Sequence, residues 1–180
     1  MLKTQNPLLL VPFKYGLIGS LMIILGLIVL FYLGRHPLLL NPILDARIPL
    51  YALIIFISFK IFKEQYNGGI MHFWQGMAIG MLAYTLMATS AALFIYIISK
   101  VNSSNFLTEY IRISTGQLVT NKDLFIETIG EKTYTETLAQ LPSTQPIHLA
   151  VDYLLKSMPI GLFLTIILSV LLRKKETTNQ

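Results

Sequence analysis

Residues 66–80 read YNGGIMHFWQGMAIG and combine a diglycine, a histidine, the single tryptophan of the chain and a GxxxG pattern. Gly68 and Gly69 can adopt positive φ angles, so they predict a tight reversal of the chain. An uncharged apolar run long enough to cross a membrane follows them. The stretch therefore indicates a turn between two membrane-spanning helices rather than a reactive site.

The composition supports a membrane protein. Hydrophobic residues make up 54% of the 180 residues and charged residues only 13%, and the mean hydropathy is +0.63. This balance is too apolar for an ordinary soluble domain. The net charge of +5 comes from basic residues beside the apolar runs, which favours membrane orientation over nucleic-acid binding. Because cysteine is absent, disulfides, thiolate nucleophiles and cysteine metal sites are excluded.

Four apolar runs predict four spans, over residues 15–33, 46–63, 73–99 and 154–172. We therefore expect an all-α membrane protein, with four transmembrane helices in a small bundle that forms a single domain over residues 1–180. The second run is the shortest and ends at Lys60 and Lys63, whose long side chains can reach the headgroups. A second run that only lies at the interface remains an alternative, and it would place the termini on opposite sides of the membrane.

The distribution of positive charge predicts the orientation. With four spans, one side of the membrane collects seven basic residues near span ends: Lys3, Lys14, Lys60, Lys63, Arg173, Lys174 and Lys175. The other side has four, which are Arg35, Arg47, Lys100 and Lys156. Since cytoplasmic loops carry the excess of Lys and Arg, both termini are expected in the cytoplasm.

Residues 101–145 are expected to form an external helical segment between the third and fourth spans. Apolar residues from Phe106 to Ile113 give a helical stripe, and Thr120 with Asp123 resembles a capping box that opens a second helix carrying Phe125, Ile129 and Leu138. Two short amphipathic helices on or just above the outer surface are predicted. Pro146 suits the first turn of another helix that reaches residue 172.

Three short stretches carry a family resemblance: KYGLIGSLMIILG (14–26), FKEQYNGGI (62–70) and HFWQGMAIGM (72–81). Together they resemble the domain of unknown function 4199 family, which comprises small four-span bacterial membrane proteins, mainly of Bacteroidota. The resemblance implies an integral protein of the bacterial inner membrane with a long external segment before the last span. It implies no established activity and no catalytic residues.

Two groups of residues around the opening stretch have predicted structural roles. Tyr66, His72 and Trp74 suit an interface belt, because amphipathic rings prefer headgroup depth. Small and aromatic residues recur every four positions in a predicted helix-packing seam, namely Gly76, Gly80, Tyr84, Ala88 and Ala92. Gly16 and Ser20 are its predicted mates in the first span. The seam could join spans of one chain or two copies of it, and both interpretations remain open.

Residues able to do chemistry are few and scattered. His148, Asp152 and Lys156 share one face of the last helix, outside the membrane. The His148 and Asp152 pair is half of a possible metal site, but an Asp152 to Lys156 ion pair explains the same face with fewer assumptions. The spans hold only hydroxyl groups and Lys60, which is unlike a carrier with ionisable groups in its path. We therefore expect no catalytic, metal or cofactor site.

The sequence thus favours a non-enzymatic accessory, scaffold or assembly subunit that presents residues 101–145 to a partner or to the membrane surface. Its expected partners are the lipid bilayer and either another membrane protein or a second copy of the chain, and nucleic acid is not expected. The alternative is a homo-oligomeric transport or channel component that uses the packing seam. A membrane-embedded enzyme comes third, because His148 and Asp152 would have to recruit further ligands.

Overall fold

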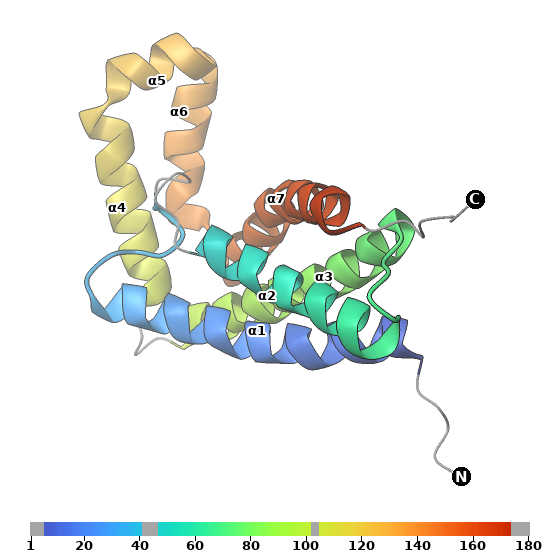
Figure 1. The fold of residues 1–180 in the computed structure, drawn as a ribbon. Helices are drawn as coiled ribbons and strands as arrows, with labels where there is room; N and C mark the ends of the chain where they lie inside the picture. The colour runs from blue at the N-terminus through green and yellow to red at the C-terminus, as the bar shows by residue number, and fades with distance from the viewer. Residues whose placement is uncertain (1–5, 41–46, 102–104, 174–180) are drawn as a thin grey trace.

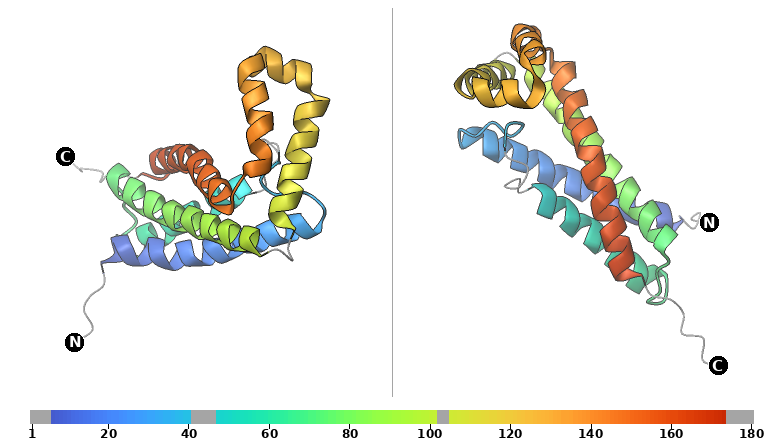
Figure 2. Two further views of the ribbon diagram at one scale, coloured as in Figure 1. Left: turned by 180° about the vertical axis from the view of Figure 1, so that it is seen from behind. Right: turned by 90° about the horizontal axis from the view of Figure 1, so that it is seen from above.

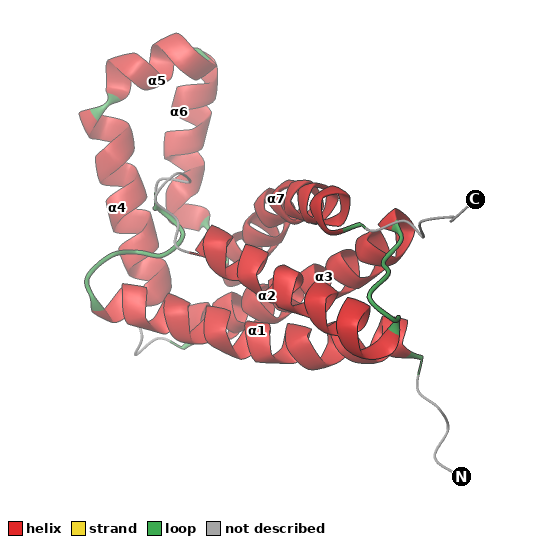
Figure 3. Cartoon of the chain, viewed as in Figure 1, coloured by secondary structure: helices red, strands yellow, loops and turns green. Residues whose placement is uncertain are grey.

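The computed structural model describes residues 6–40, 47–101 and 105–173, and every regular element in this part is helical (Figures 1 and 3). Four long helices lie alongside one another: α1 (Pro7–Tyr32), α2 (Arg47–Ile61), α3 (Phe73–Lys100) and α7 (Pro146–Leu172). A single π-helical turn, η2 (Phe62–Tyr66), continues α2. The remaining elements form a hairpin: α4 (Phe106–Thr120), α5 (Lys122–Ile129), α6 (Glu131–Gln140) and the short η4 (Leu141–Ser143). The predicted all-α fold is confirmed.

Three of the long helices, α1, α3 and α7, are long and apolar enough to cross a membrane. The chain is therefore a membrane protein by the length and composition of its helices. α2 has only 15 residues, fewer than the 18 or so that a spanning helix needs, so the predicted fourth span is not established by length. α1 begins earlier than predicted, at Pro7, because the Asn6 side chain accepts a hydrogen bond from the Leu8 amide (3.1 Å) and caps it.

The two ends of the bundle differ in what they carry. α1 begins and α7 ends at the end that also holds the connection between η2 and α3, which we call the termini end (Figures 1 and 2). The hairpin of α4, α5 and α6 stands across the opposite end, which we call the hairpin end (Figure 1). α4 and α6 stand crosswise to the long helices (Figure 1), so in a membrane the hairpin would lie along the surface rather than pass through it.

α3 and α7 pack in antiparallel fashion through small side chains. A Cβ atom on Gly76 would lie 2.7 Å from Ser169 Oγ, and one on Gly80 would lie 2.6 Å from Thr165 Cγ2. Both glycines therefore let α7 approach closer than any larger residue would allow. α7 of the same chain thus covers the seam at Gly76 and Gly80.

The contact between α3 and α7 continues toward the hairpin end. There the small residue belongs to α7 and the large residue to α3. Gly161 of α7 faces the ring of Tyr84, which occupies the space that a Cβ at Gly161 would need. The Tyr84 hydroxyl donates a 2.6 Å hydrogen bond to the Ser157 carbonyl. The α3 half of this contact was predicted from the sequence, but its α7 half was not. The α7 half repeats every four residues as Ser157, Gly161, Thr165 and Ser169.

Gly16 and Ser20 of α1 also pack against α3, but on a different face. The Ser20 hydroxyl donates to the Gly16 carbonyl (2.8 Å) and lies 3.4 Å from the Leu86 carbonyl, while a Cβ on Gly16 would lie 3.3 Å from the Ala83 carbonyl oxygen. α1 therefore covers the face of Ala83 and Leu86, and α7 covers Gly76 and Gly80. The pairing of Gly16 and Ser20 with the seam was wrong in this respect.

The segment that was predicted to be external contains three α-helices in its described residues, 105–145, and not two. Thr120 ends α4, and Asn121, whose side chain makes no capping hydrogen bond, precedes α5, so the predicted capping box at Thr120 was wrong. Gly130 then separates α5 from α6 with a φ of 82°. This left-handed conformation is open to glycine and costly for other residues. It breaks the single helix that was predicted to carry both Phe125 and Leu138.

The fit of Tyr84 against Gly161 makes a direct prediction about stability. The Gly161→Ala substitution should lower the free energy of unfolding by about 1–3 kcal/mol, because the added methyl overlaps the Tyr84 ring and forces α3 and α7 apart. The measurement is thermal unfolding in detergent, followed by circular dichroism at 222 nm. Gly26→Ala is the matched control, since a Cβ there meets no atom within 4 Å. Equal effects of the two substitutions would contradict the packing argument.

Candidate functional site

The hairpin is joined to the bundle by a cluster of aromatic rings. Asn105 adopts a left-handed conformation (φ 53°) immediately before α4, and Phe106, the first residue of the helix, is buried. The Phe106 ring lies 4.5 Å from the His36 ring and 5.1 Å from the Phe31 ring, and Tyr110 lies 5.5 Å from His36. We call Phe31, His36, Phe106 and Tyr110 the aromatic clamp, because it attaches α4 to the end of α1.

His36 is the polar centre of the aromatic clamp. Its Nε2–H donates to the Phe106 carbonyl (3.2 Å), since a carbonyl can only accept, and its Nδ1 faces the Leu38 amide at 3.4 Å. Burial is the main cause that lowers the pKa of His36 to about 4. The imidazole is therefore neutral near pH 7, and a proton on Nδ1 would oppose the Leu38 N–H.

Three buried tyrosines meet where α2, α3 and α7 come together near the hairpin end. The hydroxyls of Tyr51 and Tyr153 lie 2.6 Å apart and share a hydrogen bond. The rings of Tyr51 and Tyr84 are 4.7 Å apart, and Tyr84 bonds to α7 through the Ser157 carbonyl. Hydroxyls at this depth need hydrogen-bond partners, because burying one without a partner is costly.

Charged residues lie beside these tyrosines. The Arg47 guanidinium lies over the Tyr153 ring, 5.4 Å from its centroid, and the Lys156 ammonium lies 2.7 Å from an Asp152 carboxylate oxygen. Both groups line a cavity of about 130 Å³. We call it the tyrosine cavity, and Arg47, Tyr51, Tyr84, Asp152, Tyr153, Lys156 and Ile160 are among its lining residues. The tyrosines of its lining are buried, whereas the side chains of Asp152 and Lys156 are exposed.

His148, Asp152 and Lys156, which were predicted to share one external face of α7, have different surroundings. Asp152 and Lys156 form an ion pair at the tyrosine cavity, whereas His148 caps the first turn of α7 by accepting the Gln145 amide on Nδ1 (3.2 Å). His148 also lines a separate depression next to Tyr110. Among the described residues, no group of three or more His, Asp and Glu side chains could hold a metal ion.

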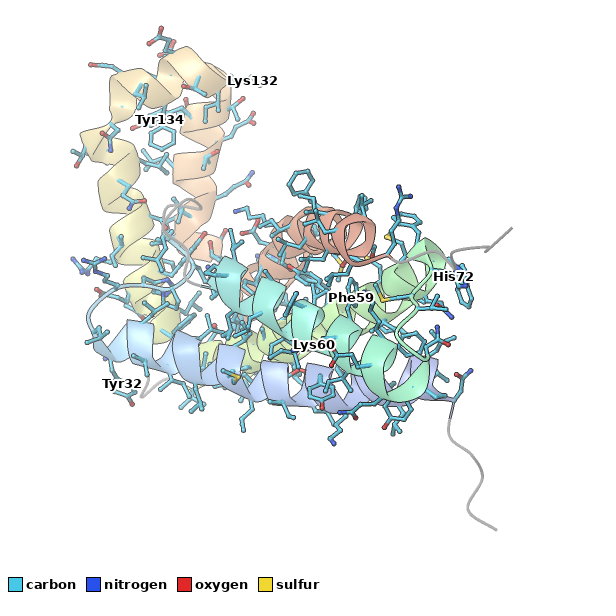
Figure 4. The ribbon with its side chains drawn as sticks, viewed as in Figure 1. Tyr32, Phe59, Lys60, His72, Lys132 and Tyr134 are labelled. Atoms are coloured by element: carbon cyan, nitrogen blue, oxygen red, sulfur yellow. The ribbon has the colours of Figure 1, made fainter. Side chains whose placement is uncertain are left out.

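The residues of the opening stretch gather at the termini end. Gly68 (φ 57°) and Gly69 (φ 80°) form the turn, and the Gln75 side-chain oxygen accepts the His72 amide at 2.9 Å. Tyr66, His72 and Trp74 are exposed there, and Figure 4 shows His72 at the opposite end of the bundle from Tyr32. The structure thus separates these rings from the aromatic clamp and the tyrosine cavity.

Neither the aromatic clamp nor the tyrosine cavity was predicted from the sequence. Tyr51 and Tyr84 fall inside apolar runs, where each hydroxyl requires a partner, and this was the available signal. The partners are 102 and 73 residues away along the chain, so no local pattern could identify them.

These features define an all-helical membrane protein with a helical hairpin across one end of its bundle. The chain belongs to the family described as protein of unknown function DUF4199, which matches residues 14–174. No curated protein and no solved structure matches the chain.

The neutral state of His36 predicts how attachment of the hairpin depends on pH. The pKa of His36 falls from 6.5 to about 4 on folding. The contribution of neutral His36 to the stability of the folded hairpin is therefore complete above pH 6.5 and is lost as the pH falls toward 4. The full effect is roughly 3 kcal/mol. Hydrogen exchange of α4 amides, corrected for intrinsic rates, should show protection decreasing through this window.

His36→Gln keeps a donor and an acceptor but does not titrate, so its α4 protection should stay level between pH 7 and pH 4. His72→Gln, at the termini end, should retain the pH dependence of the unmodified chain. Parallel profiles for His36→Gln and the unmodified chain would contradict the assignment.

Proposed function

We propose that this protein is a non-enzymatic accessory or scaffold protein of the bacterial cytoplasmic membrane. It spans the membrane four times, keeps both termini in the cytoplasm and holds its external hairpin for a protein partner. The observation that carries the proposal is an ordered hairpin with an exposed apolar tip, fixed across one end of a bundle of membrane-length helices.

The contacts of α2 support its role as the fourth span. α2 meets α7 at the Tyr51 and Tyr153 hydroxyls, and η2 meets the other end of α7, where Lys63 Nζ donates to the Leu172 carbonyl (3.2 Å). Tyr153 and Leu172 are separated by about 28 Å of helix at 1.5 Å per residue, close to the thickness of about 30 Å of the hydrocarbon core. η2 and the long Lys63 side chain extend α2 across this distance.

The charges at the two ends support the orientation. Lys14, Lys60, Lys63 and Arg173 lie in helices or at helix ends that reach the termini end. Lys63 also places its ammonium on a free carbonyl at the α7 C-terminus, where a cation is favoured. Lys3, Lys174 and Lys175 lie outside the described residues, and with them the sequence assigns seven basic residues to this side against four on the other. Such an excess favours a cytoplasmic location for the termini end.

The hairpin has its own small core, so it can present a defined surface. Leu118 of α4, Tyr134 of α6 and Leu141 of η4 are buried together, and Phe125 and Ile126 of α5 pack against them. Figure 4 places Tyr134 between the helices of the hairpin. The aromatic clamp ties this unit to α1. Together these contacts hold the hairpin in one orientation relative to the bundle.

Three large apolar side chains of the described hairpin helices are exposed. Val119 is 58% exposed, Leu124 63% and Ile129 39%, and all three lie near the two junctions of α5, at the far side from the bundle. We call these residues the apolar tip. Exposed charged residues of both signs neighbour it along the chain, among them Lys122, Asp123 and Glu127. An exposed apolar group with a polar rim is typical of a protein-binding surface.

The alternative of a homo-oligomeric transport component loses its main support. It relied on the seam from Gly76 to Ala92 as a contact between copies, and α7 of the same chain covers Gly76, Gly80 and Tyr84. The seam is therefore not available to a second copy. We retain the accessory or scaffold role as the proposed function.

The proposed topology can be tested with single cysteines, because the chain has none of its own. Arg35→Cys and Gln117→Cys should react with a membrane-impermeant maleimide in intact cells, since both positions are exposed and belong to the hairpin end. Gln65→Cys should react only after permeabilisation, because α2 carries it to the other side. Labelling of Gln65→Cys in intact cells would contradict a fourth span.

The role of the apolar tip can be tested by photo-crosslinking in cells, with a photoreactive residue at exposed position 128 of α5. A crosslinked protein band is expected in the unmodified background. The combined Val119→Lys and Leu124→Lys substitutions should abolish the band while the thermal unfolding temperature stays the same, because neither side chain is in the core. Gln117→Lys is the matched control. Crosslinks to lipid alone would indicate a membrane-surface role and reject a protein partner.

A further inference from the structure

A depression of about 310 Å³ lies where the hairpin joins the start of α7, and it is lined by residues of α4, α6, η4 and α7. Beside Leu141, its lining consists of polar side chains, namely Tyr110, Thr137, Gln140, Ser143, Thr144 and His148. We call it the polar depression. None of the described residues in this lining is Asp, Glu, Lys or Arg, so the polar depression offers hydrogen bonds rather than carboxylates or basic groups.

The cap at the start of α7 fixes the hydrogen-bonding role of His148. Its Nδ1 accepts the Gln145 amide at 3.2 Å, so the ring hydrogen lies on Nε2. The Gln145 side chain accepts the His148 amide in return, and this reciprocal pair holds the imidazole at the first turn of the helix. While the cap is in place, His148 therefore contributes an N–H donor to the lining and not a further acceptor.

The three aliphatic hydroxyl groups of the lining have the opposite role. Thr137, Ser143 and Thr144 each donate the hydroxyl hydrogen to a backbone carbonyl three or four residues earlier, at 2.7 Å. Because these hydrogens are used within the chain, the three oxygen atoms offer lone pairs to a ligand. Tyr110 and Gln140 add a hydroxyl and an amide, which can donate as well as accept.

This set of donors and acceptors distinguishes between classes of ligand. A metal cation would find no carboxylate in the lining that the structure describes, and it would meet the N–H of His148. An anion would find no Lys or Arg there, and the three aliphatic hydroxyl hydrogens are already used. A neutral ligand with several hydroxyl groups suits the lining, because each hydroxyl can donate to an oxygen atom and accept from an N–H.

The size and the carbon surface of the polar depression favour a sugar ring among such ligands. Its volume of about 310 Å³ lies at the lower end of the range of about 300–1,000 Å³ that is typical of ligand sites, so it suits a short unit rather than a long chain. Leu141 and the ring of Tyr110 add carbon surface to the lining. A pyranose has C–H groups on its faces and hydroxyls at its edge, so it can contact carbon and polar groups at once.

The polar depression lies just outside the apolar part of α7. His148 precedes the apolar run 154–172 by six residues, or about 9 Å along the helix. The headgroup region extends about 5–8 Å beyond the hydrocarbon core on each side of a bilayer. A sugar at this depth would belong to a soluble glycan or to the headgroup of a membrane glycolipid.

We propose that the polar depression binds a neutral sugar unit, which accepts a hydrogen bond from His148 Nε2 and donates its own hydroxyls to the oxygen atoms of Thr137, Ser143 and Thr144. An occupant holds the hairpin on the bundle, because the lining joins α4 and α6 to the start of α7. The site shares no residue with the apolar tip. It does not depend on a protein partner or on the orientation of the chain in the membrane.

The test uses the full chain in a polyoxyethylene detergent, which contains no sugar. The soluble probes are the methyl glycosides of glucose, galactose, mannose and N-acetylglucosamine. The membrane probes are monoglucosyl and monogalactosyl diacylglycerol, with diacylglycerol as their sugar-free control. Affinity is measured from the shift of the thermal unfolding temperature with probe concentration. At least one glycoside should give a shift that saturates, and the α6 amides should exchange hydrogen more slowly in its presence.

Two substitutions each remove one hydroxyl and keep the shape of the side chain. Thr137→Val and Tyr110→Phe should each weaken sugar binding by about two- to tenfold, the effect of losing one neutral hydrogen bond. Without sugar, the unfolding temperature should change little, because Thr137 is exposed and Tyr110→Phe retains the ring. Thr135→Val is the matched control, since Thr135 is also an exposed threonine of α6 that donates to the carbonyl four residues earlier, but it lies outside the polar depression.

The two sets of probes identify the source of the sugar. Tighter binding of a glycosyl diacylglycerol than of the matching methyl glycoside would indicate a membrane glycolipid. Equal or weaker binding of the lipid would indicate a soluble glycan.

Three results would overturn the proposal. Sugars also stabilise folded proteins by exclusion from their surface, and this general effect does not saturate. A shift that rises without saturation for every methyl glycoside would therefore show that no site exists. Equal shifts for diacylglycerol and its glycosides would show that the sugar is not recognised. Equal affinities of Thr137→Val and Thr135→Val would place any sugar site elsewhere.

Discussion

The close antiparallel contact of α3 with α7 is the constraint on which the rest of the structure depends. Lipid tails are as apolar as leucine side chains, so helices in a bilayer associate through close packing rather than through burial from water. Gly76 and Gly80 let Ser169 and Thr165 approach α3, and Gly161 makes room for the Tyr84 ring. α7 is therefore held along α3, and α2 packs against both helices.

The placement of Tyr84 has consequences for the tyrosine cavity. Since its ring fills the space at Gly161, its hydroxyl reaches the Ser157 carbonyl and its other face meets Tyr51. Tyr51 in turn hydrogen-bonds to Tyr153, which lies under Arg47. Small residues in the middle of α3 and α7 thus determine where a charged group at the start of α2 is held.

The hairpin depends on a second, local contact. Asn105 adopts a left-handed conformation directly before α4. The aromatic clamp then fixes the start of α4 against the end of α1 through His36 and Phe106. The hairpin therefore stands across the bundle at the same end as the tyrosine cavity (Figures 1 and 2).

Local features of the sequence were sufficient for the class of protein and for much of its helical content. Long uncharged runs predict membrane helices because length and hydropathy act locally, and three of the four runs have that form in the structure. The helix that begins at Pro146 and the family resemblance were likewise readable from short stretches, and the family match covers residues 14–174. The break at Gly130 was missed, because glycine permits a left-handed conformation without requiring it.

The tertiary structure alone decided which surfaces meet. A stripe of small residues shows that a helix can approach another closely, but it does not identify the partner, so α7 rather than α1 on Gly76 and Gly80 could not be read from spacing. The tyrosine cavity joins side chains from α2, α3 and α7, and the aromatic clamp joins residues 70 positions apart. Periodicity determines the face on which a residue lies, and only packing in three dimensions determines what lies opposite that face.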